Sequence, residues 1–123
     1  MHTAGNRPWP VELRLKRAEK LLEAAFDDGS RFRLPAEYLR VESPSAEVQG
    51  HGPGQKTLVH GRGHVGIIGL EPVGNYAVRI TFDDLHNTGI YSWSYLQQLG
   101  VEQETRWRDY LAALAANGLS REP

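Results

Sequence analysis

The sequence predicts an α+β fold of two layers, in which an antiparallel sheet of about five to six short strands carries short helices and a C-terminal helix. Three observations lead to this prediction. Two stretches, residues 11–34 and 65–82, alternate apolar and polar side chains with the two-residue period of half-buried strands. Glycine-containing turns interrupt both stretches. Residues 102–117 have the spacing of an amphipathic helix instead.

The first stretch is predicted to form a meander of three strands. These strands are residues 11–16, with Val11, Leu13 and Leu15 on one face, residues 20–26, with Leu22, Ala24 and Phe26 on one face, and residues 31–34. The Asp27-Asp28-Gly29 turn joins the second strand to the third, because glycine tolerates the positive φ of a tight turn. Pro35 suits the first turn of a helix, which residues 36–40 continue.

Residues 43–66 are predicted to be a long glycine-rich loop, with at most a short strand at 57–59. The strands at 65–73 and 76–82 follow, joined at Gly74-Asn75. In the second of these strands one face is predicted to carry Tyr76, Val78, Ile80 and Phe82, and the other Ala77, Arg79 and Thr81.

The C-terminal third is predicted to be helical. After a polar connection at 83–89, Ser92 is expected to cap a helix over 93–99 that Gly100 closes in the left-handed conformation. The last helix spans about 102–117 and ends before Gly118. Its apolar stripe, facing the sheet or a partner, consists of Trp107, Tyr110, Leu111 and Leu114.

Composition limits the function. The 123 residues suit one domain, which we divide into a flexible segment at 1–10, a core domain at 11–100, and a helix with a tail at 101–123. The absence of cysteine excludes disulfides, thiolate metal sites and a cysteine nucleophile. The chain has 14 basic and 15 acidic side chains, and the basic ones do not cluster as nucleic-acid binding requires. No apolar stretch is long enough to span a membrane, so we expect a cytoplasmic protein.

Chemical motifs are incomplete. Residues 50–57 approach a phosphate loop, but Gln55 replaces the glycine needed before Lys-Thr, so nucleotide binding is not predicted. Asp83, Asp84 and His86 are a candidate acid–base group that would need a pocket. A metal site is the other alternative, because neutral imidazoles bind zinc, nickel or copper, and four histidines lie in or near the loops: His51, His60, His64 and His86.

Several ordered segments resemble the gamma-butyrobetaine hydroxylase-like N-terminal domain family over about residues 10–100. The similar segments are Leu34-Pro35-Ala36-Glu37-Tyr38-Leu39-Arg40, Ser43-Pro44-Ser45, Ile80-Thr81-Phe82-Asp83-Asp84-Leu85-His86, Gly89-Ile90-Tyr91-Ser92-Trp93 and Tyr95-Leu96. The resemblance implies an α+β domain with an antiparallel sheet. In the hydroxylases this domain is accessory to a separate catalytic domain dependent on iron and 2-oxoglutarate, so the resemblance implies no oxygenase activity here.

The resemblance also implies a position for a zinc site that this chain has lost. The hydroxylase domain holds zinc with three cysteines and one histidine. Those cysteines correspond to Ser43, Ser45 and Val48, and the histidine corresponds to His86. Hydroxyls and a valine do not replace thiolates, so we expect no zinc, and packing is expected to stabilise the segment instead. His86 then either bonds to the backbone of its turn or joins His51, His60 or His64 around another metal.

These observations lead to the hypothesis of a non-catalytic binding or adaptor domain without a cofactor. The family resemblance extends to segments appended to P-loop ATPases associated with iron–sulfur clusters, which implies an accessory role beside an oxygenase or a cluster carrier. The expected partner is a protein, bound at an exposed strand edge or the loop at 50–66, and self-association stays open. The alternative is a weak zinc-binding domain that uses His86 and loop histidines.

Overall fold

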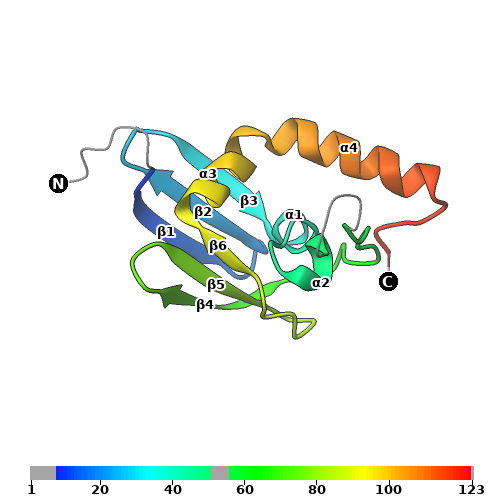
Figure 1. Ribbon diagram of the computed structural model, residues 1–123, viewed down its shortest axis with the longest axis horizontal. Coiled ribbons are helices and arrows are strands. Elements are labelled where there is room, and N and C mark those ends of the chain that lie inside the picture. The colour runs from blue at the N-terminus through cyan, green and yellow to red at the C-terminus, as the bar shows by residue number, and fades with distance from the viewer. Residues whose placement is uncertain (1–7, 51–55, 123) are drawn as a thin grey trace.

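The computed structural model describes residues 8–50 and 56–122. Six strands and four helices follow one another along the chain (Figure 1). The strands are β1 (Pro10–Lys16), β2 (Leu21–Phe26), β3 (Arg31–Pro35), β4 (Ile67–Val73), β5 (Ala77–Phe82) and β6 (Ile90–Ser92). The helices are α1 (Ala36–Val41), α2 (Ala46–Gln49), α3 (Trp93–Val101) and α4 (Gln103–Ala116). The predicted α+β class is confirmed.

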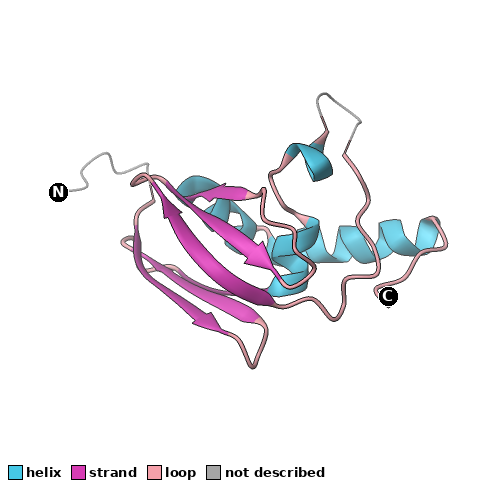
Figure 2. Cartoon of the chain, turned by 90° about the horizontal axis from the view of Figure 1, so that it is seen from below, coloured by secondary structure: helices cyan, strands magenta, loops and turns pink. Residues whose placement is uncertain are grey.

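The strands form two antiparallel three-stranded sheets, β1-β2-β3 and β4-β5-β6, where the sequence analysis expected a single sheet (Figure 2). The first meander ends at Pro35 and the second begins at Ile67, so nothing in the local periodicity showed how they meet. Leu22 and Leu34 in the first sheet and Ile80 and Phe82 in the second belong to one continuous core, which Leu99 of α3 also enters. The sheets therefore share a hydrophobic interior although no strand joins them.

Strand faces follow the predicted alternation in the middle of each sheet and depart from it at the ends. Leu22, Ala24 and Phe26 are buried together as expected. Val11 is exposed, because the register shifts between Pro10 and Glu12 at the edge of the sheet. At the start of β5 the prediction was wrong: Ala77 is buried, whereas Tyr76 lies in the preceding turn and is exposed.

Segment 43–66 differs from the predicted loop. Helix α2 was not anticipated, and residues 57–59 form no strand. Four residues of helix are too few for an apolar periodicity, and Pro44 and Gly50 beside it favour a loop reading. Strand β6 was missed for the same reason, because it has only three residues.

Ser92 caps α3 as predicted, since its hydroxyl accepts a hydrogen bond from the Tyr95 N–H at 3.1 Å. Gly100 does not close this helix: it lies inside α3, which continues to Val101. Its role is close packing, because a Cβ atom at Gly100 would lie 2.3 Å from the Cγ atom of Phe32. Pro35 precedes the first turn of α1 rather than forming part of it.

Helix α1 is held in place by tyrosine hydroxyls. Tyr38 donates to the carbonyl of Leu99 at 2.6 Å, and Tyr91 donates to the carbonyl of Leu39. Burial raises the pKa of both phenols, so they remain donors at neutral pH. These bonds attach the helix to β6 and α3, and so fix the start of the segment that carries Ser43.

Helix α4 extends beyond the sheets and over α1 (Figure 1). Tyr110 and Leu114 pack against Val41 and against Leu58 and Val59. Leu111, which was predicted to share the stripe, is exposed. The chain then returns, and Arg121 makes a two-pronged ion pair with the buried Glu37.

No helix among the described residues is long and apolar enough to cross a membrane.

Candidate functional site

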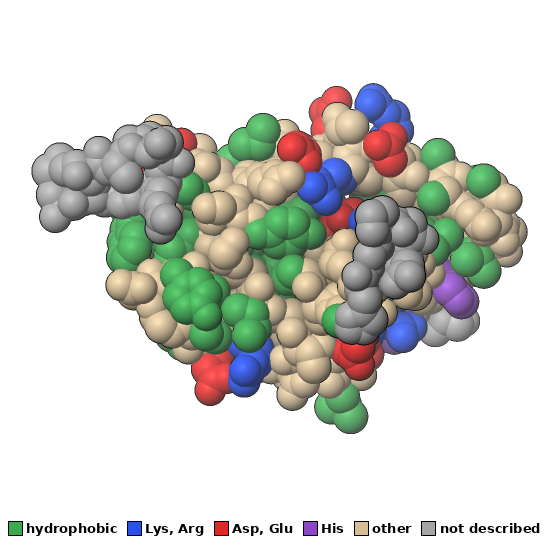
Figure 3. Space-filling view, in the orientation of Figure 1, with side chains coloured by type: hydrophobic (Ala, Val, Ile, Leu, Met, Phe, Trp, Pro, Cys, Tyr) green, Lys and Arg blue, Asp and Glu red, His purple; other side chains and the backbone are tan. Residues whose placement is uncertain are grey.

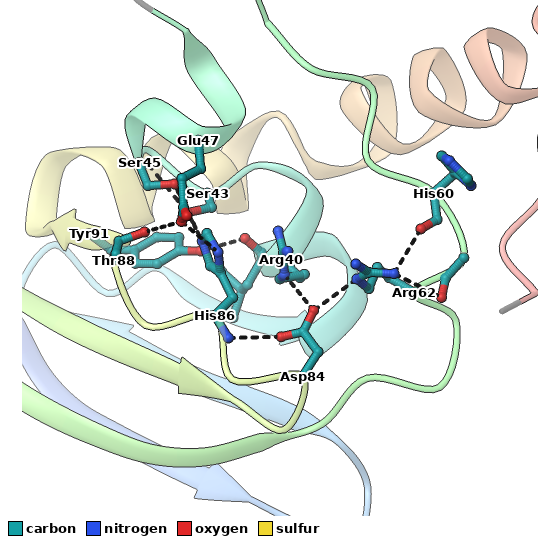
Figure 4. Close-up of polar contacts among 12 residues, drawn as sticks. Arg40, Ser43, Ser45, Glu47, His60, Arg62, Asp84, His86, Thr88 and Tyr91 are labelled. Carbon is teal, nitrogen blue, oxygen red and sulfur yellow. Dashed lines mark hydrogen bonds and ion pairs between the residues drawn. The ribbon is translucent and has the colours of Figure 1, made fainter.

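The candidate site surrounds the turn between β5 and β6. The N–H of Phe82 donates to the carbonyl of His86 at 2.9 Å, and Leu85 adopts a left-handed conformation with φ of 71°. This tight turn directs the His86 side chain inward, where only 8% of the residue is exposed. The end of α1 and the start of α2 face it (Figure 4).

Neighbouring side chains contact both ring nitrogens of His86. Its Nε2 atom lies 2.9 Å from Ser43 Oγ and 3.4 Å from Ser45 Oγ. Its Nδ1 atom lies 3.3 Å from Glu47 Oε1, which also accepts a hydrogen bond from Thr88 Oγ1 at 2.7 Å. We call Ser43, Ser45, Glu47, His86 and Thr88 the His86 cluster.

These contacts fit a neutral imidazole. Burial lowers the pKa of His86, and the Arg40 charge adds to this effect, whereas Glu47 and Asp84 oppose it. Nε2 is hydrogen-bonded to the Ser43 hydroxyl, whereas Nδ1 lies 3.3 Å from the Glu47 carboxylate. The ring is thus a structural connection between α2, the segment after α1, and the β5–β6 turn.

Asp84 organises the other side of the turn. Its Oδ2 atom accepts hydrogen bonds from Arg40 Nε at 2.9 Å and Arg62 Nε at 2.8 Å, and its Oδ1 atom accepts from the His86 N–H at 3.1 Å. Burial by itself raises the pKa of Asp84, but the bonds from Arg40 and His86 and the charges of both arginines lower it overall. The carboxylate is therefore ionised and committed to ion pairs.

The order Glu47, His86, Ser43 has the connectivity of a hydrolase triad, in which an acid orients a base and the base activates a hydroxyl. Ser43, however, is 0% exposed. Gly89 leaves it no space: a Cβ atom at Gly89 would lie 2.5 Å from Ser43 Oγ. A substrate carbonyl cannot reach this hydroxyl in the folded chain, so the arrangement is structural in this conformation.

The acid–base group predicted at Asp83, Asp84 and His86 is not assembled. Asp83 is exposed, Asp84 is paired with two arginines, and His86 Nε2 is hydrogen-bonded to Ser43. The sequence places these residues close together, but the turn directs their side chains into different surroundings.

The residues that correspond to the family's zinc ligands do converge. Ser43 and Ser45 contact His86, and Val48, on the same side of α2 as Ser45, is buried. One imidazole, two neutral hydroxyls and a valine do not form the thiolate-rich set that structural zinc requires. This donor set does not fit the family's zinc.

The other histidines do not form a ligand set in the described part of the chain, where no group of three His, Asp or Glu side chains could hold a metal. His60 lines a cavity together with His86 but is itself exposed. His64 is exposed, and its carbonyl accepts a hydrogen bond from Lys20. His51 lies outside the described residues.

Sequence reasoning missed the charged partners of the turn, which are Arg40, Glu47 and Arg62. Arg40 was named only as part of a short helix and of a segment with family resemblance, and Arg62 lies in the predicted loop. The distances along the chain, 44 residues from Arg40 to Asp84 and 22 from Arg62 to Asp84, leave no local signal that could have paired them.

A second feature is an apolar groove between α1, α3 and α4, with a volume of about 960 Å³. Tyr38 and Trp107 lie in it, with Val101 and Leu111 at 71% and 40% exposure, and Arg121 stacks on the Trp107 ring at 5.4 Å. The opposite face of the molecule is mixed: Figure 3 shows separate apolar patches, with acidic and basic side chains over α4.

Three solved structures are similar to this chain in sequence and fold. Two NMR solution structures are 44% and 48% identical in sequence to this chain, with TM-scores of 0.84 and 0.83; they cover 96% and 100% of it, and the chain covers 93% and 92% of theirs. A crystal structure from Acidithiobacillus ferrooxidans, of unknown function and belonging to the DUF971 family, is 38% identical over 74% of this chain and 91% of its own, with a TM-score of 0.58.

No curated protein matches the chain. The family model described as gamma-butyrobetaine hydroxylase-like, N-terminal, matches residues 13–97, which include the His86 cluster and most of α3. The resemblance noted in the sequence is thereby confirmed. The chain belongs to the gamma-butyrobetaine hydroxylase-like N-terminal family.

Proposed function

We propose that this domain is a non-catalytic protein-binding module that serves another protein as an adaptor. One contrast supports the proposal. The side chains with catalytic potential, Ser43, Asp84 and His86, are bonded to one another or to arginines below the surface. The apolar side chains of Val101 and Leu111, by contrast, are open to solvent in the groove.

The groove is suited to an apolar segment of a partner protein. Aromatic rings supply large contact areas at interfaces, and the half-buried Trp107 is surrounded by a polar rim of Glu104, Arg108 and Arg121 with charges of both signs. The family's description places such domains at the N-terminus of hydroxylase-like proteins. An oxygenase or an iron–sulfur cluster carrier is the partner we propose, with all thiolate ligands on the partner because this chain has no cysteine.

A three-way affinity capture from the native cell lysate tests the proposal. The proteins are the wild type, the groove variant Val101→Glu with Leu111→Glu, and the control Tyr76→Glu, an exposed residue in the β4–β5 turn. We expect the wild type and the control to recover one protein at near one-to-one stoichiometry, and the groove variant to lose it. Equal recovery by all three, or no stoichiometric partner, would contradict the proposal.

Metal binding is the second candidate. His60, His86 and Glu47 line the same cavity, but they do not form a ligand set among the described side chains as they stand, so a metal would have to draw them together. To bind a metal, His86 would have to release Ser43 or Glu47. Metal analysis of protein purified without an affinity tag decides this. About one equivalent of zinc, nickel, copper or iron, with a higher melting temperature on metal addition, would favour metal binding over the adaptor role.

We place the adaptor in the cytoplasm, and cell fractionation tests this part of the proposal. Self-association through the groove is the competing use of the same surface. Sedimentation of the wild type and the groove variant distinguishes the two, because a dimer formed through the groove dissociates in the variant.

A further inference from the structure

Arg40 has a buried donor without an acceptor. The residue is 8% exposed, and its Nε atom donates to Asp84 Oδ2 at 2.9 Å. Its Nη1 atom is buried and has no hydrogen-bond partner among the described residues. Since buried polar groups are almost always hydrogen-bonded, and charged ones lose most when they are not, this atom indicates a missing acceptor.

Arg62 brings a second guanidinium to the same place. Its Nε atom shares Asp84 Oδ2 with Arg40, and its Nη1 atom contacts the carbonyls of His60 and Gly61 at 3.2 and 3.5 Å (Figure 4). Both arginines thus contact Asp84 through a single nitrogen, although a guanidinium can form two parallel bonds with a carboxylate. The two positive charges are set against the negative charge of Asp84 and that of Glu47, which lies nearby.

A cavity of about 400 Å³ adjoins these groups. Arg40, Arg62, His60, His86 and Glu47 line it, with residues 57–59 and Val48. His86 contributes no charge while it is neutral. Glu47 is the only acid that lines the cavity in the described part of the chain; its side chain is 66% exposed and is bonded to His86 and Thr88.

We propose that Arg40 and Arg62 form a binding site for one carboxylate group, which enters this cavity and accepts the unused guanidinium hydrogen bonds. A carboxylate offers two acceptor oxygens and carries a single negative charge. A phosphate dianion would be repelled more strongly by Glu47. The site does not depend on the groove between α3 and α4, so it stands apart from the proposed adaptor role.

NMR titration of the full chain at constant ionic strength and pH 7 tests the site. The probes are acetate, inorganic phosphate, and two blocked peptides that differ only in one Glu or Gln. We expect saturable shifts at the Arg40 and Arg62 side chains and around His60 with acetate, and weaker binding of phosphate. Tighter binding of the Glu peptide than of acetate identifies a protein acid as the source, and equal binding identifies a free organic acid.

Three variants make the test specific. Arg62→Gln is expected to weaken acetate binding about tenfold, because it removes a charge-assisted donor. Glu47→Gln leaves both arginines in place and is expected to tighten binding about threefold, because it removes a like charge. Arg79→Gln, which lies in the β4–β5 hairpin and pairs with Glu71, is the charge-matched control and should change nothing.

Several results would overturn the proposal. They are chemical shifts that do not saturate, an equal loss of acetate affinity in Arg62→Gln and Arg79→Gln, tighter binding of phosphate than of acetate, or no gain in acetate affinity in Glu47→Gln. Glu47→Gln leaves the Arg40–Asp84–Arg62 network intact. It therefore still tests the carboxylate site if Arg62→Gln fails to fold.

Discussion

The His86 cluster and the groove between α3 and α4 use side chains in opposite ways. In the cluster, Ser43, Ser45 and His86 are buried and contact one another, and the exposed Glu47 lies 3.3 Å from the His86 ring. In the groove, apolar side chains such as Val101 and Leu111 remain exposed. The first arrangement stabilises the fold, because buried polar groups need partners. The second leaves apolar area that another molecule can cover.

The cluster lies where the family resemblance places zinc ligands in the hydroxylases. The segment after α1 meets the β5–β6 turn at His86, with hydroxyls at two of those positions and Val48 at the third. Neutral and charge-assisted hydrogen bonds connect the residues around this turn. We therefore expect the stability of this junction to depend on close packing around Ser43 and on the protonation state of His86.

The largest expected change in the free energy of unfolding comes from placing cysteines at the three positions that correspond to cysteines in the hydroxylases. Because Ser43 Oγ and Ser45 Oγ lie 2.9 and 3.4 Å from His86 Nε2, they are close to the roughly 3.5 Å that separates ligand atoms around a tetrahedral zinc. The triple variant Ser43→Cys, Ser45→Cys, Val48→Cys should bind one equivalent of zinc. Its free energy of unfolding should rise by about 4 kcal/mol when free zinc exceeds the Kd a thousandfold.

Metal analysis and chemical denaturation with and without a chelator measure this effect. Adding His86→Gln to the triple variant is the control, and it should abolish most of the zinc-dependent stabilisation. A folded triple variant that binds no zinc would mean that the four positions do not converge as the structure places them.

The next effect tests how tightly the cluster is packed. Gly89→Ala brings a Cβ atom to 2.5 Å from Ser43 Oγ and 3.1 Å from the Tyr91 ring. We expect a loss of about 1–3 kcal/mol in the free energy of unfolding, as is usual for overpacking. Gly69→Ala is the matched control within a strand, because nothing lies within 4 Å of its Cβ position, and it should be close to neutral. Urea denaturation compares the two, and equal values would contradict tight packing at Gly89.

These two regions also show what a sequence can predict. Strand periodicity located β1, β2, β3, β4 and β5, and the capping residue Ser92 located α3, because these signals act over a few neighbouring residues. The separation into two sheets was missed, since it depends on contacts between segments far apart in the chain. Gly100 was misread for the same reason: its neighbour Phe32 is distant in sequence, and this contact decides its role.

The site was predictable only in part. The family resemblance identified Ser43, Ser45, Val48 and His86 as positions that meet, and the structure brings the two serines to the histidine. The charges around them were not predictable. Arg40, Arg62 and Asp84 share one ion-pair network although no periodicity or spacing connects them, and the open groove depends on how α4 leaves α3.

A smaller effect concerns pH. Because burial lowers the pKa of His86 in the folded chain, the unfolded chain binds a proton at this histidine first as the pH falls. The contribution of neutral His86 to stability is complete above the ordinary histidine pKa of about 6.5. It is lost as the pH falls through the lower pKa that His86 has in the folded chain. We expect the free energy of unfolding to decrease between about pH 7 and 5.

Urea denaturation over this range, repeated with His86→Asn, isolates the histidine. The variant should show a smaller slope against pH whatever its stability at pH 7. The lowered pKa of Asp84 has the same sign but acts at lower pH, because that carboxylate is protonated only in stronger acid. An unchanged slope in His86→Asn would mean that His86 is as easily protonated in the folded chain as in the unfolded one.

The smallest change in the free energy of unfolding is expected at the exposed apolar residues of the groove. Val101→Gln and Leu111→Gln replace exposed apolar side chains, and each should change the free energy of unfolding by less than about 0.5 kcal/mol, as is usual for surface substitutions. Ser43→Ala removes the donor to a buried imidazole nitrogen and should cost about 1–3 kcal/mol. Chemical denaturation of the three variants under one set of conditions makes the comparison. If the groove substitutions destabilise the chain as much as Ser43→Ala does, then Val101 and Leu111 support the fold themselves, and the groove is not a surface left open for a partner.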